Sequence, residues 1–385
     1  MEKIYLDNAA TTFPKPKLVA DAVFNYVTNI GSNINRGSYT QALKSEELVF
    51  NTREKIATFF GFAESKNVVF TKNITESLNV ILKSFLSKGD HVITTSMEHN
   101  AVGRPLIQLE ETGIEVSYAK CDRYGQIDLK SLVNLIKDNT KAVIVTHASN
   151  VCGTILPIKS IGEICKNHAI SFIVDSAQTA GVLPIDMMAC NIDALAFTGH
   201  KGLLGIQGIG GFIVRDEMSN KMSPFISGGT GTMSELSHMP DFLPDKFEAG
   251  TQNLPAICSL NSSIDYLNQI GLDAIFKKET SLSDLFISKL SDINEINIIA
   301  KSKDVPSVAV VSLDIGVADN AELAEYLDTN YGIMTRCGLH CAPLAHKTLG
   351  TFPHGTIRFS FSHYNTEEEV LFAAEKVREF IDLCL

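Results

Sequence analysis

Short apolar runs typical of buried strands alternate with helix-length amphipathic stretches between residues 66 and 215. Such alternation builds βαβ units, which place their strands in a mostly parallel sheet covered by helices on both faces. We expect helices over residues 75–86 and 158–168. Seven strands are predicted, over residues 67–71, 91–95, 114–118, 141–146, 171–175, 193–198 and 211–214. The sequence therefore predicts an α/β fold with a seven-stranded, mostly parallel sheet.

The pattern changes after a Gly-, Ser- and Pro-rich excursion at 226–247. Helices are expected at 255–271, 272–290, 320–330 and from 366, and strands at 307–313, 332–336 and 356–361. The 385 residues exceed the usual domain of about 100–200 residues. We predict a large α/β domain over 15–255 and a smaller α+β domain over 256–385, which also takes the N-terminal segment 1–14.

Charge and composition exclude several classes of protein. The 33 basic and 44 acidic residues give a net charge of −11, so the chain lacks the basic surface of a nucleic-acid-binding or membrane-surface protein. No apolar stretch is long enough to span a membrane, and the first residues do not resemble a signal peptide. We expect a cytoplasmic protein whose eight cysteines are reduced thiols.

Two predicted strands end in chemically informative residues. The run 172–174 leads into Asp175, and the strand 193–198 leads into Gly199-His200-Lys201. A lysine and an aspartate at the ligand-binding edge of such a sheet suit pyridoxal 5'-phosphate (PLP), which forms a Schiff base with the lysine and keeps its ring nitrogen protonated beside the carboxylate. Taken singly, Lys201 would more often be a surface lysine and Asp175 a helix cap, but the glycines around Lys201 and the apolar strand before it favour the cofactor site.

A phosphate site is expected beside them. Asn73 or Thr75 caps a predicted helix, and a helix N-terminus attracts anions. The functional interpretation places the cofactor phosphate there, close to Thr198 and His200, and the alternative is a simple cap. His99 follows another strand end, where it either lies against a planar ring or has a structural role.

Several short motifs occur together in order along the chain. They are Tyr5-Leu6-Asp7-Asn8-Ala9-Ala10-Thr11-Thr12, Thr75-Glu76-Ser77, Glu98-His99, Asn150, Asp175-Ser176-Ala177-Gln178, Gly199-His200-Lys201 and Phe247-Glu248-Ala249-Gly250-Thr251. With this set the chain resembles the NifS-like cysteine desulfurases and selenocysteine lyases of the class V aminotransferase family. The resemblance covers nearly the whole chain and implies the PLP-dependent transferase fold type I.

The resemblance also implies residue roles. Lys201 would bind PLP covalently, Asp175 would pair with the ring nitrogen, and Gln178 would bond the phenolate oxygen. His99 would stack on the ring, Asn150 would lie by the ring oxygen or the substrate carboxylate, and Thr75, Thr198 and His200 would hold the phosphate. Thr251 would reach the phosphate of the other subunit, which implies a homodimer with shared active sites.

The segment from Thr335 to Pro343 resembles the loop of the group closer to selenocysteine lyases. In that loop Cys341 would be the nucleophile that accepts sulfur as a persulfide, and a neighbouring His or Arg would favour its thiolate. Arg336 and Arg358 are the predicted substrate-binding arginines, Arg358 for the carboxylate. The chain departs from the family where Leu339 replaces the first His of a pair and where Cys337 is an extra cysteine, interpreted as a packed thiol.

The sequence does not support a zinc site, a dinucleotide-binding site or a glycosidase-like active site. Cys337, His340 and Cys341 lack the second ligand pair of structural zinc, so no metal is predicted. The glycine run 205–211 does not match a dinucleotide fingerprint, and Asp175 and Asp314 lie in different predicted domains, so no glycosidase-like carboxylate pair is expected.

The leading hypothesis is a PLP-dependent cysteine desulfurase that converts L-cysteine, or L-selenocysteine, to L-alanine. A sulfur-acceptor protein is a further expected partner, for example in iron–sulfur cluster assembly. The alternatives are a class V aminotransferase or selenocysteine lyase of the same fold, and a non-catalytic sulfur-trafficking scaffold.

Overall fold

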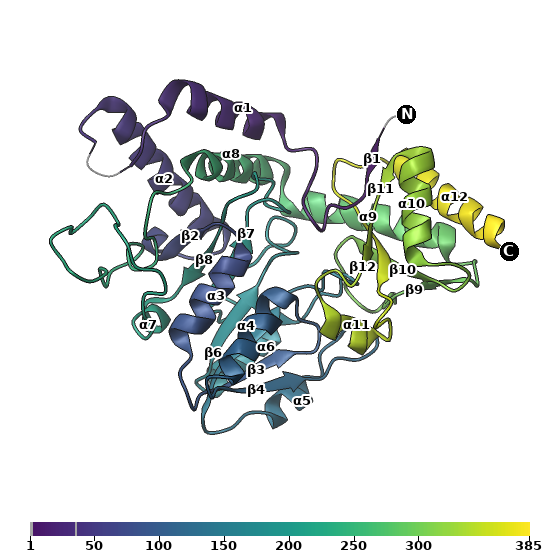
Figure 1. The fold of residues 1–385 in the computed structure, drawn as a ribbon, viewed down its shortest axis with the longest axis horizontal. Coiled ribbons are helices and arrows are strands. Elements are labelled where there is room, and N and C mark those ends of the chain that lie inside the picture. Colours follow the sequence, from purple (N-terminus) through teal and green to yellow (C-terminus); the bar gives the residue numbers. More distant parts are fainter. Residues whose placement is uncertain (1–2, 35–36) are drawn as a thin grey trace.

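A computed structural model describes residues 3–34 and 37–385. Its largest element is a seven-stranded sheet with strand order β2-β8-β7-β6-β5-β3-β4 (Figure 1). The five strands from β7 to β4 run parallel, while β8 is antiparallel to both β7 and β2. The strands are β2 (Val68–Thr71), β3 (His91–Thr95), β4 (Glu115–Ala119), β5 (Thr140–Thr146), β6 (Ser171–Asp175), β7 (Ala194–Thr198) and β8 (Gly210–Val214). The predicted mostly parallel, seven-stranded sheet is confirmed.

Helices cover both faces of this sheet. Neighbouring residues of a strand point to opposite faces, so one strand contributes side chains to the hydrophobic clusters on both sides. Ile173 packs in the cluster that contains α3 and α4, whereas Phe172 and Val174 pack in the cluster that contains α2, α6 and α8. The helices of this part are α1 (Lys17–Asn25), η1 (Tyr26–Ile30), α2 (Thr40–Phe59), η2 (Ser65–Asn67), α3 (Ile74–Phe85), α4 (Asn100–Glu110), α5 (Leu129–Asn134), α6 (Ile158–Asn167), α7 (Asp216–Ser219) and α8 (Leu254–Ile270).

A second, antiparallel sheet has the strand order β12-β13-β10-β9. It shares a separate hydrophobic cluster with α9, α10 and α12. Its strands are β9 (Ile296–Ile298), β10 (Val310–Ile315), β12 (Arg336–Gly338) and β13 (Thr356–Ser360), and the adjacent helices are α9 (Leu272–Leu290), α10 (Asn320–Tyr331), α11 (Pro343–Leu349) and α12 (Glu367–Cys384). The expected α+β character of this region is therefore present.

The single strand expected at 332–336 is instead two strands. β11 (Ile333–Met334) pairs in parallel with β1 (Ile4–Tyr5), whereas β12 pairs with β13. The chain therefore changes partners at Thr335, which periodicity within one short run cannot reveal. The division of the chain near residue 255 stays a prediction, and α8 beyond it packs in the cluster of the large sheet.

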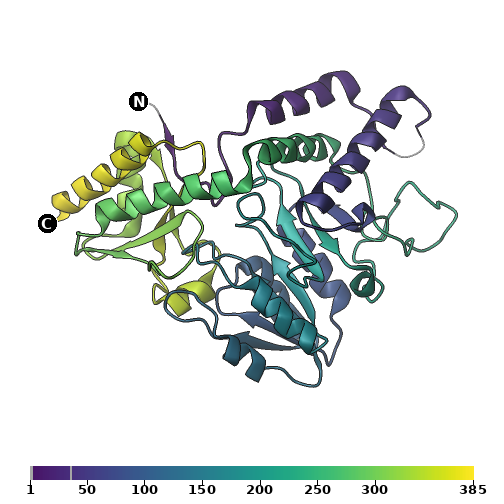
Figure 2. The same cartoon turned by 180° about the vertical axis from the view of Figure 1, so that it is seen from behind.

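The N-terminal segment connects the two sheets. After β1, Asp7 bridges to Ser360 of β13, and five residues later the amide of Thr12 donates to the carbonyl of His200 beyond β7. Figures 1 and 2 both show this segment passing from β11 toward α1 and α8. Within the described ranges, no helix combines the length and apolar character needed to cross a membrane.

Candidate active site

The carboxyl ends of the parallel strands gather the predicted site residues along one edge of the large sheet. Asp175 ends β6, Thr198 ends β7 with Lys201 in the following turn, Asn150 follows β5, and His99 follows β3. Parallel strands point the same way, so residues separated by more than a hundred positions meet at this edge. These four residues therefore lie along one edge of the sheet, and the roles assigned to them stay predictions.

Asp175 and Lys201 are the two charged groups at the centre. Asp175 is buried, accepts the Ala177 amide at 2.8 Å, and forms no ion pair within the described part of the chain. Burial raises the pKa of Asp175, and the Ala177 amide and Lys201 oppose that effect. Burial, reinforced by Arg358, lowers the pKa of Lys201 to about 8. A partly desolvated amine of this kind loses its proton readily, as Schiff-base formation requires.

His99 is the N-cap of α4. Its Nδ1 accepts the Ala101 amide at 3.0 Å, which leaves the ring proton of the neutral imidazole on Nε2. Burial, followed by Lys201 and three arginines, lowers the pKa of His99 to about 4. The ring is therefore neutral near pH 7 and its orientation is fixed by the helix.

Two polar atoms on the β7 side are buried and have no hydrogen-bond partner among the residues that the structure describes. They are Oγ1 of Thr198 and Nδ1 of His200. Burial lowers the pKa of His200 to about 4. Thr75 lies exposed in the first turn of α3, whose N-cap is Asn73. Buried polar groups in proteins are normally hydrogen-bonded, so these atoms fit the phosphate of PLP, as the unpaired Asp175 fits its protonated ring nitrogen.

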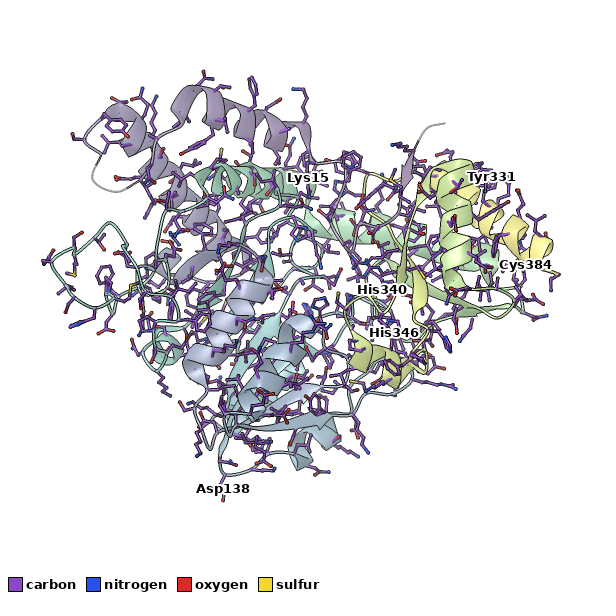
Figure 3. All side chains as sticks on the ribbon, in the orientation of Figure 1. Lys15, Asp138, Tyr331, His340, His346 and Cys384 are labelled. Carbon is purple, nitrogen blue, oxygen red and sulfur yellow. The ribbon has the colours of Figure 1, made fainter. Side chains whose placement is uncertain are left out.

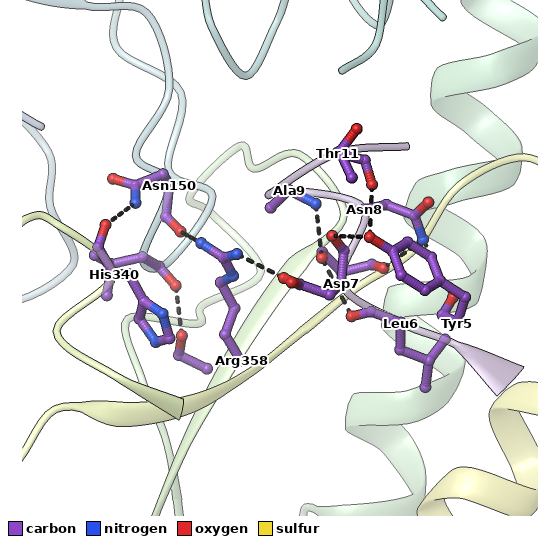
Figure 4. A network of polar contacts seen from close by, with 12 residues as sticks. Tyr5, Leu6, Asp7, Asn8, Ala9, Thr11, Asn150, His340 and Arg358 are labelled. Carbon is purple, nitrogen blue, oxygen red and sulfur yellow. Dashed lines mark hydrogen bonds and ion pairs between the residues drawn. The ribbon is translucent and has the colours of Figure 1, made fainter. Parts of the chain in front are cut away.

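Arg358 of β13 is the centre of a polar network (Figure 4). Its Nη1 donates to the Asn150 carbonyl at 3.0 Å and its Nη2 donates to Asp7 Oδ1 at 2.8 Å. Its Nε is buried and has no hydrogen-bond partner in the described part of the chain. The Asn150 side chain in turn donates to the His340 carbonyl at 2.7 Å. The predicted carboxylate-binding arginine thus lies directly beside the predicted asparagine.

The Cys341 loop is fastened to the large sheet. Besides the bond from Asn150, the Asn100 amide donates to the Cys341 carbonyl at 2.7 Å, one residue from His99. His340 and Cys341 both have left-handed backbone angles, with φ of 48° and 56°, a conformation that costs side-chain-bearing residues free energy and recurs at functional sites. Cys341 is exposed, whereas His340 is buried.

His340 of this loop and His346 of α11 lie close together (Figure 3), with ring centroids 5.7 Å apart. Burial lowers the pKa of His340 to about 2 and that of His346 to about 4. Both rings are therefore neutral near pH 7. His346 belongs to α11, outside the loop that contains Leu339, and its Nδ1 lies 2.7 Å from Thr351 Oγ1.

Gln178 lines the same cavity as Lys201 and donates to the Ala9 carbonyl at 3.2 Å. The remaining predicted residues lie at the rim of this centre or apart from it. Arg336 is exposed on β12 opposite Arg358, and burial followed by Asp319 raises the pKa of the half-buried Cys337. Thr251 is exposed and lines a surface hollow with Arg53 and Gly229, to which Lys201 does not contribute.

Three residues of the site carried no assigned role in the sequence. Asp7 contacts Arg358, and Lys15 donates to the His200 carbonyl at 2.6 Å. Buried Glu98 accepts Thr95 Oγ1 at 2.5 Å and the Thr146 amide at 3.1 Å, and burial raises its pKa to about 8. Asp7 and Glu98 belong to the motifs that carry the family resemblance, so these motifs were the feature of the sequence that could have pointed to them. Across residues 3–34 and 37–385, no three His, Cys, Asp or Glu side chains gather as a metal site would require.

Comparisons with known proteins agree with this arrangement. The sequence model of the aminotransferase class-V family matches residues 4–372. A probable cysteine desulfurase from Methanothermobacter thermautotrophicus is 34% identical over 384 residues, which cover 98% of this chain and 94% of that protein. The apo structure of a cysteine desulfurase from Thermococcus onnurineus matches with a TM-score of 0.93 at 32% identity, over 99% of this chain and 95% of that one. The cysteine desulfurase CsdA from Escherichia coli matches with a TM-score of 0.90 at 27% identity, over 100% and 96% of the two chains.

Proposed function

The chain belongs to the class-V aminotransferase family, and from this membership we propose that it is a PLP-dependent cysteine desulfurase. It converts L-cysteine to L-alanine and retains the sulfur on Cys341 as a persulfide. The relatives and the structural neighbours named above are cysteine desulfurases. The observation that carries the proposal is the attachment of the exposed Cys341 loop to Asn150 and Asn100, at the same sheet edge as Lys201 and Asp175.

PLP, when bound, supplies an electron sink that weakens the bonds around the substrate Cα. Lys201 would hold the cofactor through Nζ and then carry a proton at that atom, for which its lowered pKa is suited. Asp175 would keep the ring nitrogen protonated, and Thr75, Thr198 and His200 would bind the phosphate. His99, neutral and oriented by the Ala101 amide, would lie against the ring.

Arg358 and Asn150 would orient the substrate. A guanidinium meets a carboxylate with two parallel N–H donors, and the buried, unpartnered Nε of Arg358 is one donor available for that purpose. Asp7 already contacts Nη2, so the substrate carboxylate joins an ion pair that holds the guanidinium in place.

On the protein side, sulfur transfer would be the task of the Cys341 thiol. The Cys341 thiolate attacks the substrate sulfur, and a new S–S bond forms while the Cβ–S bond breaks. The electron pair of the broken bond goes to the substrate carbon, which takes up a proton. The balance is one L-cysteine and one thiol giving one L-alanine and one persulfide.

Product analysis tests this assignment. PLP-loaded protein is given L-cysteine and, separately, L-selenocysteine, and alanine is quantified beside sulfide or selenide. Cys341→Ala should lower alanine formation from cysteine about a hundredfold or more while retaining the visible band of bound PLP, and Lys201→Ala should lose that band. Cys337→Ala is the matched control and should resemble the wild type.

Each result separates the proposal from its alternatives. Alanine from selenocysteine alone indicates a selenocysteine lyase, and a keto acid with conversion of PLP to its amine form indicates an aminotransferase. Full desulfuration by Cys341→Ala removes this thiol from the mechanism. A wild type that binds PLP but forms no alanine from either substrate overturns the desulfurase proposal.

A further inference from the structure

Three hydrogen-bond donors from the N-terminal segment converge on one carbonyl oxygen, that of His200. Lys15 Nζ donates at 2.6 Å, Thr11 Oγ1 at 3.1 Å and the Thr12 amide at 3.1 Å. A carbonyl oxygen has two lone pairs and is usually satisfied by one or two donors. Three donors, one of them charged, hold this oxygen more firmly than secondary structure would.

The segment that carries these donors is itself anchored at its other end. Asn8 Nδ2 donates to the Ser360 carbonyl at 2.9 Å, the Ala9 amide donates to Ser360 Oγ at 2.8 Å, and Asp7 pairs with Arg358. Lys15 therefore approaches His200 from a fixed support rather than from a free terminus.

Lys15 has an unusual environment for a lysine. It is partly buried, and among the described residues no carboxylate lies within ion-pair distance of its Nζ. Burial lowers the pKa of Lys15 to about 8. A desolvated ammonium without a counter-charge is costly, so its retention at this carbonyl calls for a role beyond general solubility.

We propose that Lys15 is a positioning residue for Lys201, a role that rests on the proposed function: together with Thr11 and Thr12, it fixes the peptide plane from which the cofactor-binding lysine projects. The His200 carbonyl and the Lys201 amide belong to the same planar peptide unit. Holding the oxygen therefore restrains the peptide plane that ends at the Lys201 Cα, the atom from which the side chain leaves the backbone. It also fixes His200, whose Nδ1 is one of the two unpartnered atoms on the phosphate side.

The test compares Lys15→Met and Lys15→Arg in the PLP-loaded full-length protein. The main measurement is visible circular dichroism of the bound cofactor relative to its absorbance, because this ratio reports how uniquely the Lys201-bound chromophore is oriented. We expect the ratio to fall by about half in Lys15→Met and kcat to fall about tenfold, with KM for cysteine nearly unchanged. Lys15→Arg keeps a charged donor and should recover most of both losses.

Lys17→Met is the matched control, because Lys17 is an exposed lysine two residues away that pairs with Asp21. It should match the wild type. Thr11→Val removes another donor to the same oxygen and should lower the dichroism ratio in the same direction, which keeps the test available if Lys15→Met does not fold. Wild-type dichroism and kcat in a folded Lys15→Met, or in Thr11→Val if that variant is needed, would overturn the positioning role. A wild type with no visible PLP band overturns the proposed function, and this inference with it.

Discussion

Arg358 is a fully buried guanidinium, 2% exposed, whose charge is matched by Asp7. Replacing it by lysine keeps the positive charge but removes the planar pair of donors that meets a carboxylate. We expect Arg358→Lys to raise KM for L-cysteine about ten- to a hundredfold while the visible band of bound PLP persists. Steady-state alanine formation measures this change. Arg378→Lys, at a surface ion pair with Asp292, is the control, and an unchanged KM in Arg358→Lys would exclude Arg358 from substrate binding.

His147 predicts part of the acid sensitivity of the fold. Its ring is buried, with Nδ1 2.9 Å from Thr179 Oγ1, and burial lowers its pKa to about 4 from an ordinary value of 6.5. Between these values the unfolded chain takes up a proton that the folded state excludes, so its contribution to stability is lost as the pH falls from 6.5 toward 4.

The matched experiment is urea unfolding at pH 7 and pH 5. We expect the wild type to lose about 2 kcal/mol more than His147→Gln over this interval, because glutamine does not titrate. His168→Gln, on the exposed end of α6, should behave as the wild type. Equal losses in the wild type and His147→Gln would contradict the assignment of a buried neutral ring.

Some residues of the site could be predicted from the sequence and others could not. Asp175, Lys201 and His99 could be placed because each follows a strand whose apolar pattern is local. Asp7 and Lys15 could not be assigned roles, because their partners lie 351 and 185 positions away. No local periodicity encodes a contact of that range, and the N-terminal segment has little regular structure to position it.

At the scale of elements, the Lys201 turn packs directly on the turn that follows β6. A Cβ on Gly181 would lie 2.1 Å from the carbonyl oxygen of Gly202, the residue after Lys201, and Gly181 has φ of +84°. We expect Gly181→Ala to lower the free energy of unfolding by about 2–4 kcal/mol, since it combines an unfavourable backbone angle with a clash against backbone. The visible PLP band should also weaken as the Lys201 turn is displaced.

Gly89 offers a matched control for this substitution. It has a similar φ of +90°, but a Cβ there would meet nothing within 4 Å. Gly89→Ala should therefore cost only about 1 kcal/mol in urea unfolding. Equal costs for the two variants would show that the close approach of the two turns does not matter.

Elements were predicted well where one continuous segment belongs to a single sheet or a single helix. The strands of the large sheet and the helices α8 and α9 lie within a few residues of expectation. Residues 332–336 were predicted wrongly as one strand. They form β11 and β12, which belong to different sheets, and the pairing of strands depends on tertiary structure. The excursion at 226–247 forms no helix or strand, as its composition indicated.

At the scale of the whole molecule, the position of Thr251 predicts shared sites. It is exposed and lines a hollow to which Lys201 of the same chain does not contribute, whereas the resemblance assigns it to the phosphate of another subunit. Thr251→Asp would place a carboxylate against that phosphate. We expect Lys201→Ala and Thr251→Asp each to be inactive alone.

Co-expression of these two variants with different affinity tags isolates mixed dimers. Each mixed dimer would contain one native site, so about half of the wild-type activity should return. Doubly tagged Lys201→Ala dimers are the control and should stay inactive. Inactive mixed dimers would indicate that each site is built from one chain.

The N-terminal segment that joins the two sheets can make its contacts only late in the synthesis of the chain. A ribosome releases β1 and Asp7 first, but their partners β11, Arg358 and Ser360 lie more than 320 positions later in the chain. Contacts of such long range form only after the intervening chain exists. A nascent chain that ends just after Lys201 therefore lacks Cys341, and its N-terminal segment lacks the contacts with β11, Arg358 and Ser360. Under the proposed function, sulfur transfer to Cys341 would begin only when almost the whole chain has been made.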